Sequence, residues 1–255
     1  MSHDDFLKMQ MELGRSITPL FTVPGVTTAV FRRDWLHCAD QGVAADFLGN
    51  LFHECAQKLP GATDKIRCRA LWLKIKAFYA ANKVQDKLIG LRPGGFRQQG
   101  KSPKLRGNAA CCRALIPFGH QIAMELLDST YAPHQAMQIA ALKLLECYNC
   151  LTKSSADWTE VLPEASKDFA IQYQALELFY EGTVNWVVKP KMHQFLEMCC
   201  SGSKPNMSWC YRDEDYGGSI AQLCRIKGGC WNRPVQYSRK MLSLFKTKNK
   251  VPRIV

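Results

Sequence analysis

Asp34 and His37 are the residues whose types and position could do chemistry, because they lie at a predicted junction between a strand and a helix. β-Branched and aromatic side chains favour a strand over Val26–Phe31. Apolar residues that recur every four positions from Val43 to Leu59 predict the helix. A carboxylate at the C-terminal end of a strand faces the edge where α/β sheets bind ligands, and it could hold a hard divalent cation. The alternative is that Asp34 caps the helix or lies in a solvated turn.

A second candidate for chemistry is the acidic triplet Asp213-Glu214-Asp215, which follows a predicted strand over 206–212. The triplet opens a predicted helix that runs to about Leu223. Successive helical residues are separated by about 100°, so at most one or two of the three carboxylates can face a common ligand. The alternative is that the acids stabilise the positive end of the helix dipole.

Basic residues gather in two further places. The segment 90–107 contains five lysines and arginines and no acid, and its glycines and prolines predict a loop. This loop is either an arm that grips phosphates or a solvated connection between helices. Lys189 and Lys191 could likewise contact a DNA backbone or be ordinary solvated residues. The candidate nucleic-acid contacts are Arg92, Arg97, Lys101, Lys104, Arg106, Lys189, Lys191 and Arg212.

The composition indicates a polyanion as the partner. The chain has 255 residues, 47% of them hydrophobic, and a formal net charge of +12. Such a charge favours nucleic acid, and no apolar run approaches the roughly 18 residues of a membrane span, so no membrane partner is expected. The N-terminus MSHDDFLKMQ is polar and acidic, unlike a secretory signal. We therefore expect a nuclear or cytoplasmic protein that is not secreted.

The twelve cysteines do not form a pattern typical of a disulfide framework. Cys147-x-x-Cys150 is a candidate zinc pair, but it lies within a predicted helix and has no second pair at zinc-site spacing. Reduced thiols are the better interpretation.

Helical periodicity dominates the rest of the chain. Helices are predicted over 4–13, 64–85, 108–127, 133–151, 166–180 and 190–199, with a bend at Pro117 and caps at Thr63 and Ser166. Short strands are predicted over 26–31, 186–188 and 206–212. A last helix is predicted from Pro234, and 247–255 is expected to be a disordered basic tail. The pattern therefore predicts a mainly α fold with a small α/β part.

Two blocks of sequence resemble one family of enzymes. The string D-x-x-H at 34–37, with the run GVAADFLGNL at 42–51, resembles the second catalytic aspartate block of DDE/D cut-and-paste DNA transposases. Within that family it is most similar to CACTA-type elements and their relatives. Far downstream, WVVKPKMH at 186–193 and WCYRDEDYGGSI at 209–220 resemble the segments that lead to the last catalytic acid. The two matches stand in the order that the family has, with a helix-rich stretch between them.

The resemblance implies an RNase H-like catalytic core that is interrupted by an all-helical insertion. The core, incomplete in this chain, would be formed by 20–59 and 186–246. The insertion would be 60–185, and the basic tail 247–255 would lie outside both.

The resemblance also implies a metal-dependent site. Asp34 would be the second catalytic acid and Glu214 the third, with Asp213 as the alternative metal ligand. They would bind Mg²⁺ or Mn²⁺, with one ion activating the attacking water or 3′-hydroxyl and the other stabilising the leaving oxygen. His37 and His193 match family positions, where they would orient a carboxylate or contact the scissile phosphate.

The chain departs from the family before Asp34. Only 33 residues precede this position, and their aspartates, Asp4 and Asp5, have no strand before them, unlike the first catalytic aspartate of the family. We therefore expect a transposase-derived nucleic-acid-binding protein without nuclease activity, with DNA as its partner and homo-oligomers as a further prediction. One alternative is an active Mg²⁺-dependent transposase or endonuclease core that another segment completes. The other alternative is a helical protein-interaction scaffold.

Overall fold

The computed structural model describes residues 2–28, 33–96, 100–151, 158–202, 204–207, 209–211 and 217–218. Two compact units divide the chain, Met1–Trp209 and Cys210–Val255, and nearly all described residues belong to the first. These residues are mainly helical and contain no strand. None of the described helices combines the length and the hydrophobicity that crossing a bilayer requires.

A short helix, α1 (His3–Glu12), begins the described chain, close to the predicted range 4–13. Ser2 and Asp5 form a capping box, in which each side chain accepts a hydrogen bond from the other residue's backbone N–H. The short 3-10 helix η1 (Pro19–Thr22) follows, and the ring of Phe21 contacts the rings of His3 and Phe6.

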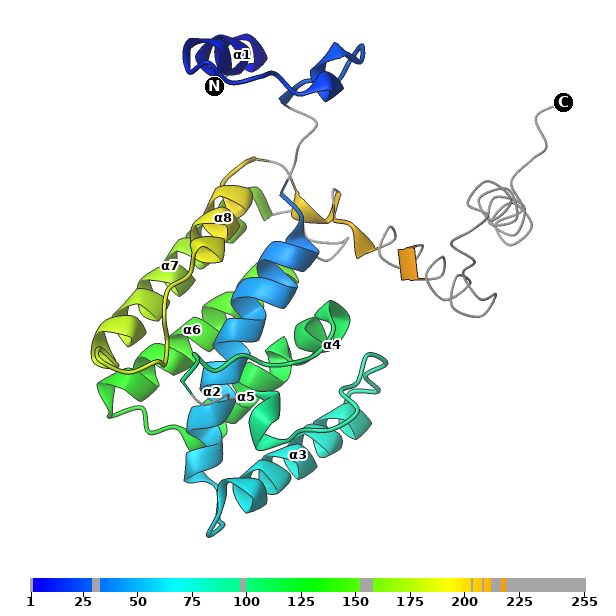
Figure 1. Cartoon of the computed structure of the whole chain (residues 1–255). Coiled ribbons are helices and arrows are strands. Elements are labelled where there is room, and N and C mark those ends of the chain that lie inside the picture. The colour runs from blue at the N-terminus through cyan, green and yellow to red at the C-terminus, as the bar shows by residue number, and fades with distance from the viewer. Residues whose placement is uncertain are drawn as a thin grey trace, which may run out of the picture. The chain divides into compact units, whose positions relative to one another are not determined.

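The helix made by η3 and α2 is central to the remaining elements (Figure 1). Nine residues of π-helix, η3 (Leu36–Ala44), continue directly into α2. The π-helical part contacts α4 and α8, and α2 contacts α3 and α5. α6 packs on α5 and α7, and α7 packs on α8. The α-helices are α2 (Ala45–Lys58), α3 (Asp64–Ala81), α4 (Ala109–Ala114), α5 (Ile116–Leu126), α6 (Ala132–Asn149), α7 (Trp158–Phe179) and α8 (Pro190–Cys199).

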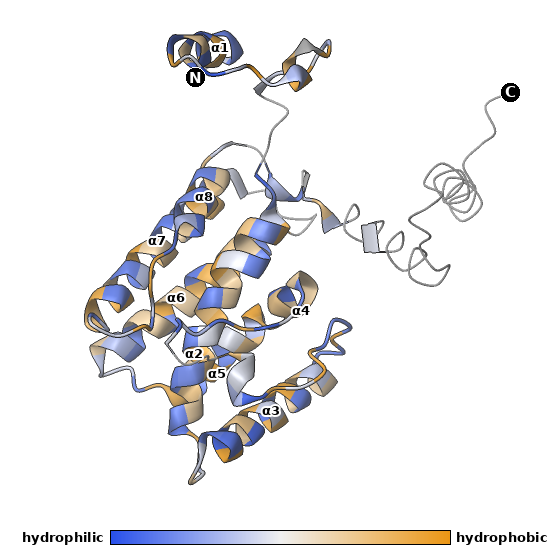
Figure 2. Ribbon diagram, in the orientation of Figure 1, coloured by the Kyte–Doolittle hydropathy of each residue, from blue (hydrophilic) through white to orange (hydrophobic). Residues whose placement is uncertain are grey.

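The first two turns of α2 are buried on all sides. Every residue from Ala45 to Phe52 is buried, including the polar Asp46 and Asn50. A helix buried on all sides must be covered by other elements. Phe47 contacts the ring of Phe169 on α7, and Phe52 contacts a ring on α5. Around the centre, the ribbons in Figure 2 change between apolar and polar colours, as expected for helices with one face in a core.

Local signals predicted several helices correctly. Thr63 caps α3, because its Oγ1 accepts a hydrogen bond from the backbone N–H of Ile66, although the helix ends at Ala81 rather than at 85. The predicted helix 108–127 is divided at Leu115, and Pro117 lies in the first turn of the second part. Prolines also lie in the first turns of α6 and α8, as predicted.

The prediction for 166–180 was wrong at its start. α7 begins at Trp158, so much of the predicted connection before Ser166 is helical. Ser166 is a buried residue within the helix, and its hydroxyl donates to the carbonyl of Pro163 instead of capping. The ring of Tyr173 lies in the core, as helical spacing predicted, whereas Phe179 is exposed.

The predicted strands are not found in the described residues. Trp186 has a left-handed backbone (φ 58°), which interrupts the extended segment expected at 186–188. The 3-10 helix η5 (Pro205–Met207) occupies the start of the segment predicted as a strand over 206–212. Residues 26–28 are not in a strand, and 29–32 lie outside the described residues, as do the helix predicted from Pro234 and the tail. A mainly helical fold is therefore what the structure supports.

Candidate nucleic-acid interface

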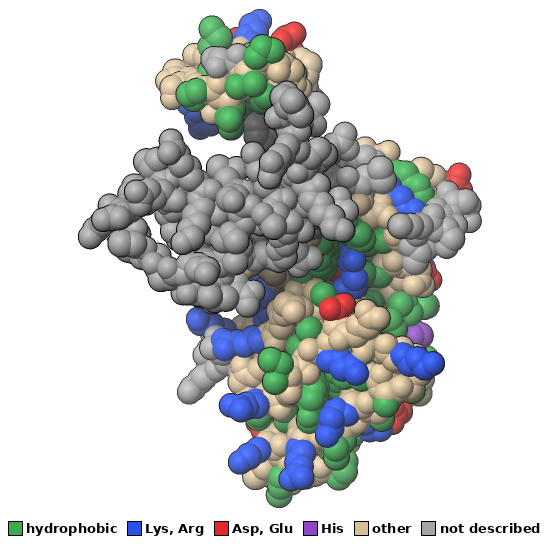
Figure 3. All heavy atoms as spheres, turned by 90° about the vertical axis from the view of Figure 1, so that its right-hand side faces the viewer, with side chains coloured by type: hydrophobic (Ala, Val, Ile, Leu, Met, Phe, Trp, Pro, Cys, Tyr) green, Lys and Arg blue, Asp and Glu red, His purple; other side chains and the backbone are tan. Residues whose placement is uncertain are grey.

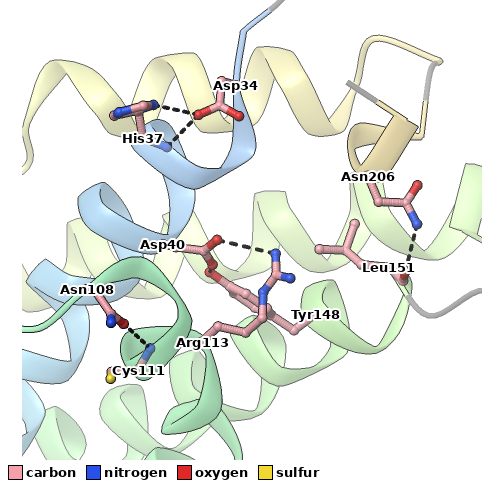
Figure 4. A network of polar contacts seen from close by, with 9 residues as sticks. All are labelled: Asp34, His37, Asp40, Asn108, Cys111, Arg113, Tyr148, Leu151 and Asn206. Carbon is pink, nitrogen blue, oxygen red and sulfur yellow. Dashed lines mark hydrogen bonds and ion pairs between the residues drawn. The ribbon is translucent and has the colours of Figure 1, made fainter. Parts of the chain in front are cut away.

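Asp34 and His37 form a hydrogen-bonded pair at the start of the central helix (Figure 4). The Oδ2 atom of Asp34 lies 2.9 Å from the backbone nitrogen of His37 and 2.7 Å from its Nδ1. A carboxylate that accepts a hydrogen bond from the N–H three residues later is acting as an N-cap. The helix begins at Trp35, eight residues before the predicted start at Val43, and Asp34 has the capping geometry that was the alternative interpretation.

The other predicted catalytic residues are not brought into one described cluster. His193 is on α8 with 77% of its side chain exposed, and its Nε2 lies 3.5 Å from a carboxylate oxygen of Glu197. Glu197 also forms an ion pair with Arg33. Asp213 and Glu214 lie outside the described residues, as do the candidate contacts Arg97 and Arg212. Among the described residues, Asp34 is therefore the single predicted metal ligand.

A buried polar network that the sequence did not reveal lies one turn after His37. Asp40 is fully buried, and its Oδ1 accepts a hydrogen bond of 2.6 Å from the Tyr148 hydroxyl. Its Oδ2 lies 3.3 Å from Nη2 of Arg113, whose guanidinium is 4.4 Å from the centre of the Trp209 ring. Figure 4 shows the side chains of Asp40, Arg113 and Tyr148, which converge from η3, α4 and α6. The network has a structural role, because it neutralises a carboxylate that would otherwise be costly to bury.

The predicted basic segments meet at one cleft. A cavity of about 960 Å³ is bounded by residues of 100–107, of 183–191 and of the central helix. No aspartate or glutamate is among the described residues that line it. We call this cavity the basic cleft, and its basic lining residues are Lys101, Lys104, Arg106, Lys189 and Lys191. Arg92, also a candidate contact, is exposed but does not line the cleft.

One wall of the basic cleft depends on a close backbone approach to α2. A Cβ atom at Gly49 would lie 2.4 Å from the Cα of Lys104, so only glycine allows this segment to lie against the helix. The N–H of Leu105 donates to the carbonyl of Ala45, at 2.8 Å. The side-chain amide of Asn50 donates to the carbonyl of Pro103, at 3.1 Å. These contacts fix the backbone that carries Lys104.

The same asparagine holds the opposite wall. The backbone N–H of Trp186 donates to Oδ1 of Asn50, at 2.9 Å. The Trp186 ring is buried against the rings of Phe47 and Tyr173. A left-handed conformation at a bulky residue costs of order 1–3 kcal/mol. The hydrogen bond and the ring packing offset this strain, and together they direct the chain towards Lys189.

Three of the five basic side chains are held by partners within the protein. The buried carboxylate of Asp46 lies 2.9 Å from Nζ of Lys189 and 3.6 Å from Nζ of Lys104. Lys104 also donates to the carbonyl of Gln41, and Lys191 donates to that of His37. Each ammonium has three N–H donors, so these contacts leave donors available.

The other two cations are not paired. The side chains of Lys101 and Arg106 are exposed and have no hydrogen-bond or ion-pair partner among the described residues. The cleft therefore keeps a large positive excess, because Asp46 supplies one negative charge against five positive ones. An anion with several charged oxygens is the kind of ligand that this arrangement attracts.

These features define a class: a mainly helical protein with a preformed basic cleft at its central helix. A comparison of the chain with protein-family models, with curated proteins and with solved structures finds no match. The assignment of a function therefore depends on the site itself.

Proposed function

We propose that this chain binds the phosphate backbone of a nucleic acid in the basic cleft. The observation that carries the proposal is the convergence of Lys101, Lys104 and Arg106 with Lys189 and Lys191, from segments about 80 residues apart, on a cleft with no described acidic lining residue. Lysine and arginine contacts to phosphates dominate nucleic-acid affinity. The formal net charge of +12 adds long-range attraction in the same direction.

The lining of the cleft favours backbone contacts over base recognition. Its aromatic residue among the described positions, Phe96, is buried and not available for stacking on a base. The remaining lining residues are basic, apolar or uncharged polar, the last including Gln41. Phosphate contacts fix the position of a protein on a duplex without reading its sequence. The expected binding is therefore weakly dependent on sequence and strongly dependent on salt.

Salt dependence tests this proposal directly. If all five basic residues contact phosphates, log K for duplex DNA falls with log salt at a slope of about −4.5, or about 500-fold between 50 and 200 mM. The variant Lys101→Ala/Arg106→Ala removes the two unpaired cations and should reduce the slope by about 1.8. Fluorescence anisotropy with a labelled 30-bp duplex would measure it.

The matched control is Lys8→Ala/Lys167→Ala. It removes two exposed cations that have no side-chain partner among the described residues and do not line the cleft. It should leave the slope within about 0.5 of the parent's. Equal losses in the two variants would mean that net charge alone drives binding, and the cleft would lose its role.

We propose more specifically that the chain descends from a DDE/D transposase with an RNase H-like core. It is supported by the sequence blocks at 34–37 and 186–193 and by their proximity: Lys191 donates to the carbonyl of His37, and the Cys38 thiol lies 3.5 Å from the carbonyl of Lys191. The ancestral site would hold Mg²⁺ on carboxylates. Of the carboxylates expected there, the described residues include Asp34 alone, and one of its oxygens already accepts two hydrogen bonds, so they do not by themselves fit a two-metal site.

A nicking assay separates binding from catalysis. If the chain is a binding protein without nuclease activity, the parent should bind the duplex but not cut it in about 5 mM Mg²⁺ or Mn²⁺ at about neutral pH. It also predicts that Asp34→Ala and Glu214→Ala leave the affinity unchanged. Metal-dependent cleavage that either substitution abolishes would instead establish an active transposase-type core.

A further inference from the structure

A second basic surface lies on α3, away from the residues that line the basic cleft. At about 100° per residue, Lys65, Arg69 and Lys76 fall within an arc of about 40° on this helix. All three are exposed. The buried Leu71 and Ile75 lie about 140° and about 100° around the helix from the centre of this arc. We call Lys65, Arg69 and Lys76 the α3 stripe.

The pairing of charges distinguishes the α3 stripe from other basic residues of the same helix. Arg67 bonds to the side chain of Gln57 and the carbonyl of Gly61, and Lys74 forms an ion pair with Glu125. The three stripe residues have no side-chain partner among the described residues. Arg67 and Lys74 therefore make contacts that stabilise the fold, whereas the side chains of the α3 stripe make no such contact among the described residues.

The surroundings of the stripe are also poor in acids. Asp64, the acidic residue of α3, lies about 100° away from Lys65 around the helix. Figure 3 shows the side of the molecule on which Figure 1 places α3, and lysines and arginines greatly outnumber acids over its lower part. A sustained positive surface of this kind attracts polyanions.

We propose that the α3 stripe is a second phosphate-backbone contact, so that the protein holds duplex DNA at two separate surfaces. The choice of partner rests on the proposed function of the basic cleft. The stripe extends over about 16 Å, which corresponds to about five phosphate positions along one strand of a duplex. Three cations can therefore meet three phosphates without a change in the helix.

The main competing partner is an anionic membrane surface. Ile66 and Leu73 are exposed on α3 next to the stripe. An interfacial helix, however, buries a continuous apolar face in the lipid. The apolar face of α3 is already occupied by the protein core, through residues such as Cys68, Leu71 and Phe78. Charge complementarity with a polyanion is the better fit.

The test compares the triple variant Lys65→Ala/Arg69→Ala/Lys76→Ala with a control of equal charge, Lys8→Ala/Arg15→Ala/Lys167→Ala. The full chain is used, and thermal unfolding monitored by circular dichroism checks that both variants fold like the parent. Binding of a labelled 30-bp duplex is measured between 50 and 200 mM salt. The stripe variant should lower the salt slope by about 2.7 and weaken binding at least tenfold at 100 mM, and the control should not.

The outcomes separate the stripe from the cleft. A lower salt slope in both the stripe variant and Lys101→Ala/Arg106→Ala supports contacts at both surfaces. Loss of binding in the stripe variant alone supports the α3 stripe as a phosphate contact and overturns the cleft as a site. Loss in Lys101→Ala/Arg106→Ala alone overturns the α3 stripe and supports the cleft. Equal behaviour of the stripe variant and its control overturns the proposal. The proposal is also overturned if the parent does not bind the duplex but binds vesicles of phosphatidylserine and phosphatidylcholine through the stripe residues.

Discussion

Replacing Asp40 by asparagine is expected to destabilise the helical unit by about 3 kcal/mol. The carboxylate is fully buried, lies 2.6 Å from the Tyr148 hydroxyl and forms an ion pair with Arg113. Breaking a buried charge pair costs about 3–5 kcal/mol, since one charge remains without its partner. The Arg113 side chain is 28% exposed and also stacks on Trp209, so part of its charge stays solvated. The lower end of that range therefore applies.

The free energy of unfolding and the Tm of parent and variant are measured by urea and thermal unfolding. A loss of about 3 kcal/mol corresponds to a decrease of about 6–12 °C in Tm. A double-mutant cycle of Asp40→Ala, which removes the acceptor, with Tyr148→Phe should give a coupling free energy of about 1.5–3 kcal/mol, as expected for a hydrogen bond to a charged group. Asp168→Asn is the control, because its carboxylate is half-exposed and pairs with Lys143 at the surface. That variant should lose less than about 1 kcal/mol. An Asp40→Asn protein as stable as Asp168→Asn would refute the reasoning.

Two further predictions concern the close approach at α2 and the buried thiols. Gly49→Ala places a Cβ against the backbone of Lys104 and Leu105, so we expect a loss of about 1–3 kcal/mol of stability and weaker DNA binding. In the control Gly119→Ala, the new Cβ meets only side-chain atoms of α2, so this variant should lose less stability. Equal stability of the two variants in urea would contradict this packing. Burial raises the pKa of Cys112 from 9.0 to about 12, so the thiol ionises in the unfolded chain before it ionises in the folded protein. The contribution of Cys112 to stability is therefore present below pH 9 and should fall by about 1 kcal/mol between pH 8 and 10, in addition to the losses from the other buried thiols. Cys112→Ala should lose less stability across that interval, and a pH dependence identical to the parent's would count against the thiol.

Helix boundaries were predictable where local chemistry sets them. Thr63, Pro133 and Pro190 act through their own backbone geometry and the nearest N–H groups, which adjacent sequence reveals. Ser166 has the same capping chemistry but lies in the middle of α7. Apolar packing of both flanks of that helix outweighs the local signal, since most helical stability comes from tertiary contacts.

The candidate site was predictable in its residue types but not in its assembly. The sequence indicated that the basic residues of 90–107, and also Lys189 and Lys191, could contact phosphates. It gave no sign that these two groups lie together in the fold. Their convergence depends on Gly49 and on a left-handed Trp186, and neither has a periodic signature. Asp40 was missed for a similar reason, because a polar residue in a helical pattern is normally assigned to solvent.

Asp46 and Asn50 explain how the cleft can concentrate positive charge. They lie one helical turn apart on α2, so their side chains emerge on the same face. Asn50 bonds to the backbone of both walls, at Pro103 and Trp186. Asp46 then holds the ammonium groups of Lys104 and Lys189 near one another, which their mutual repulsion would otherwise oppose. These two lysines have therefore already lost conformational freedom on folding. A phosphate that binds there meets donors that are in place, and this lowers the entropic cost of association.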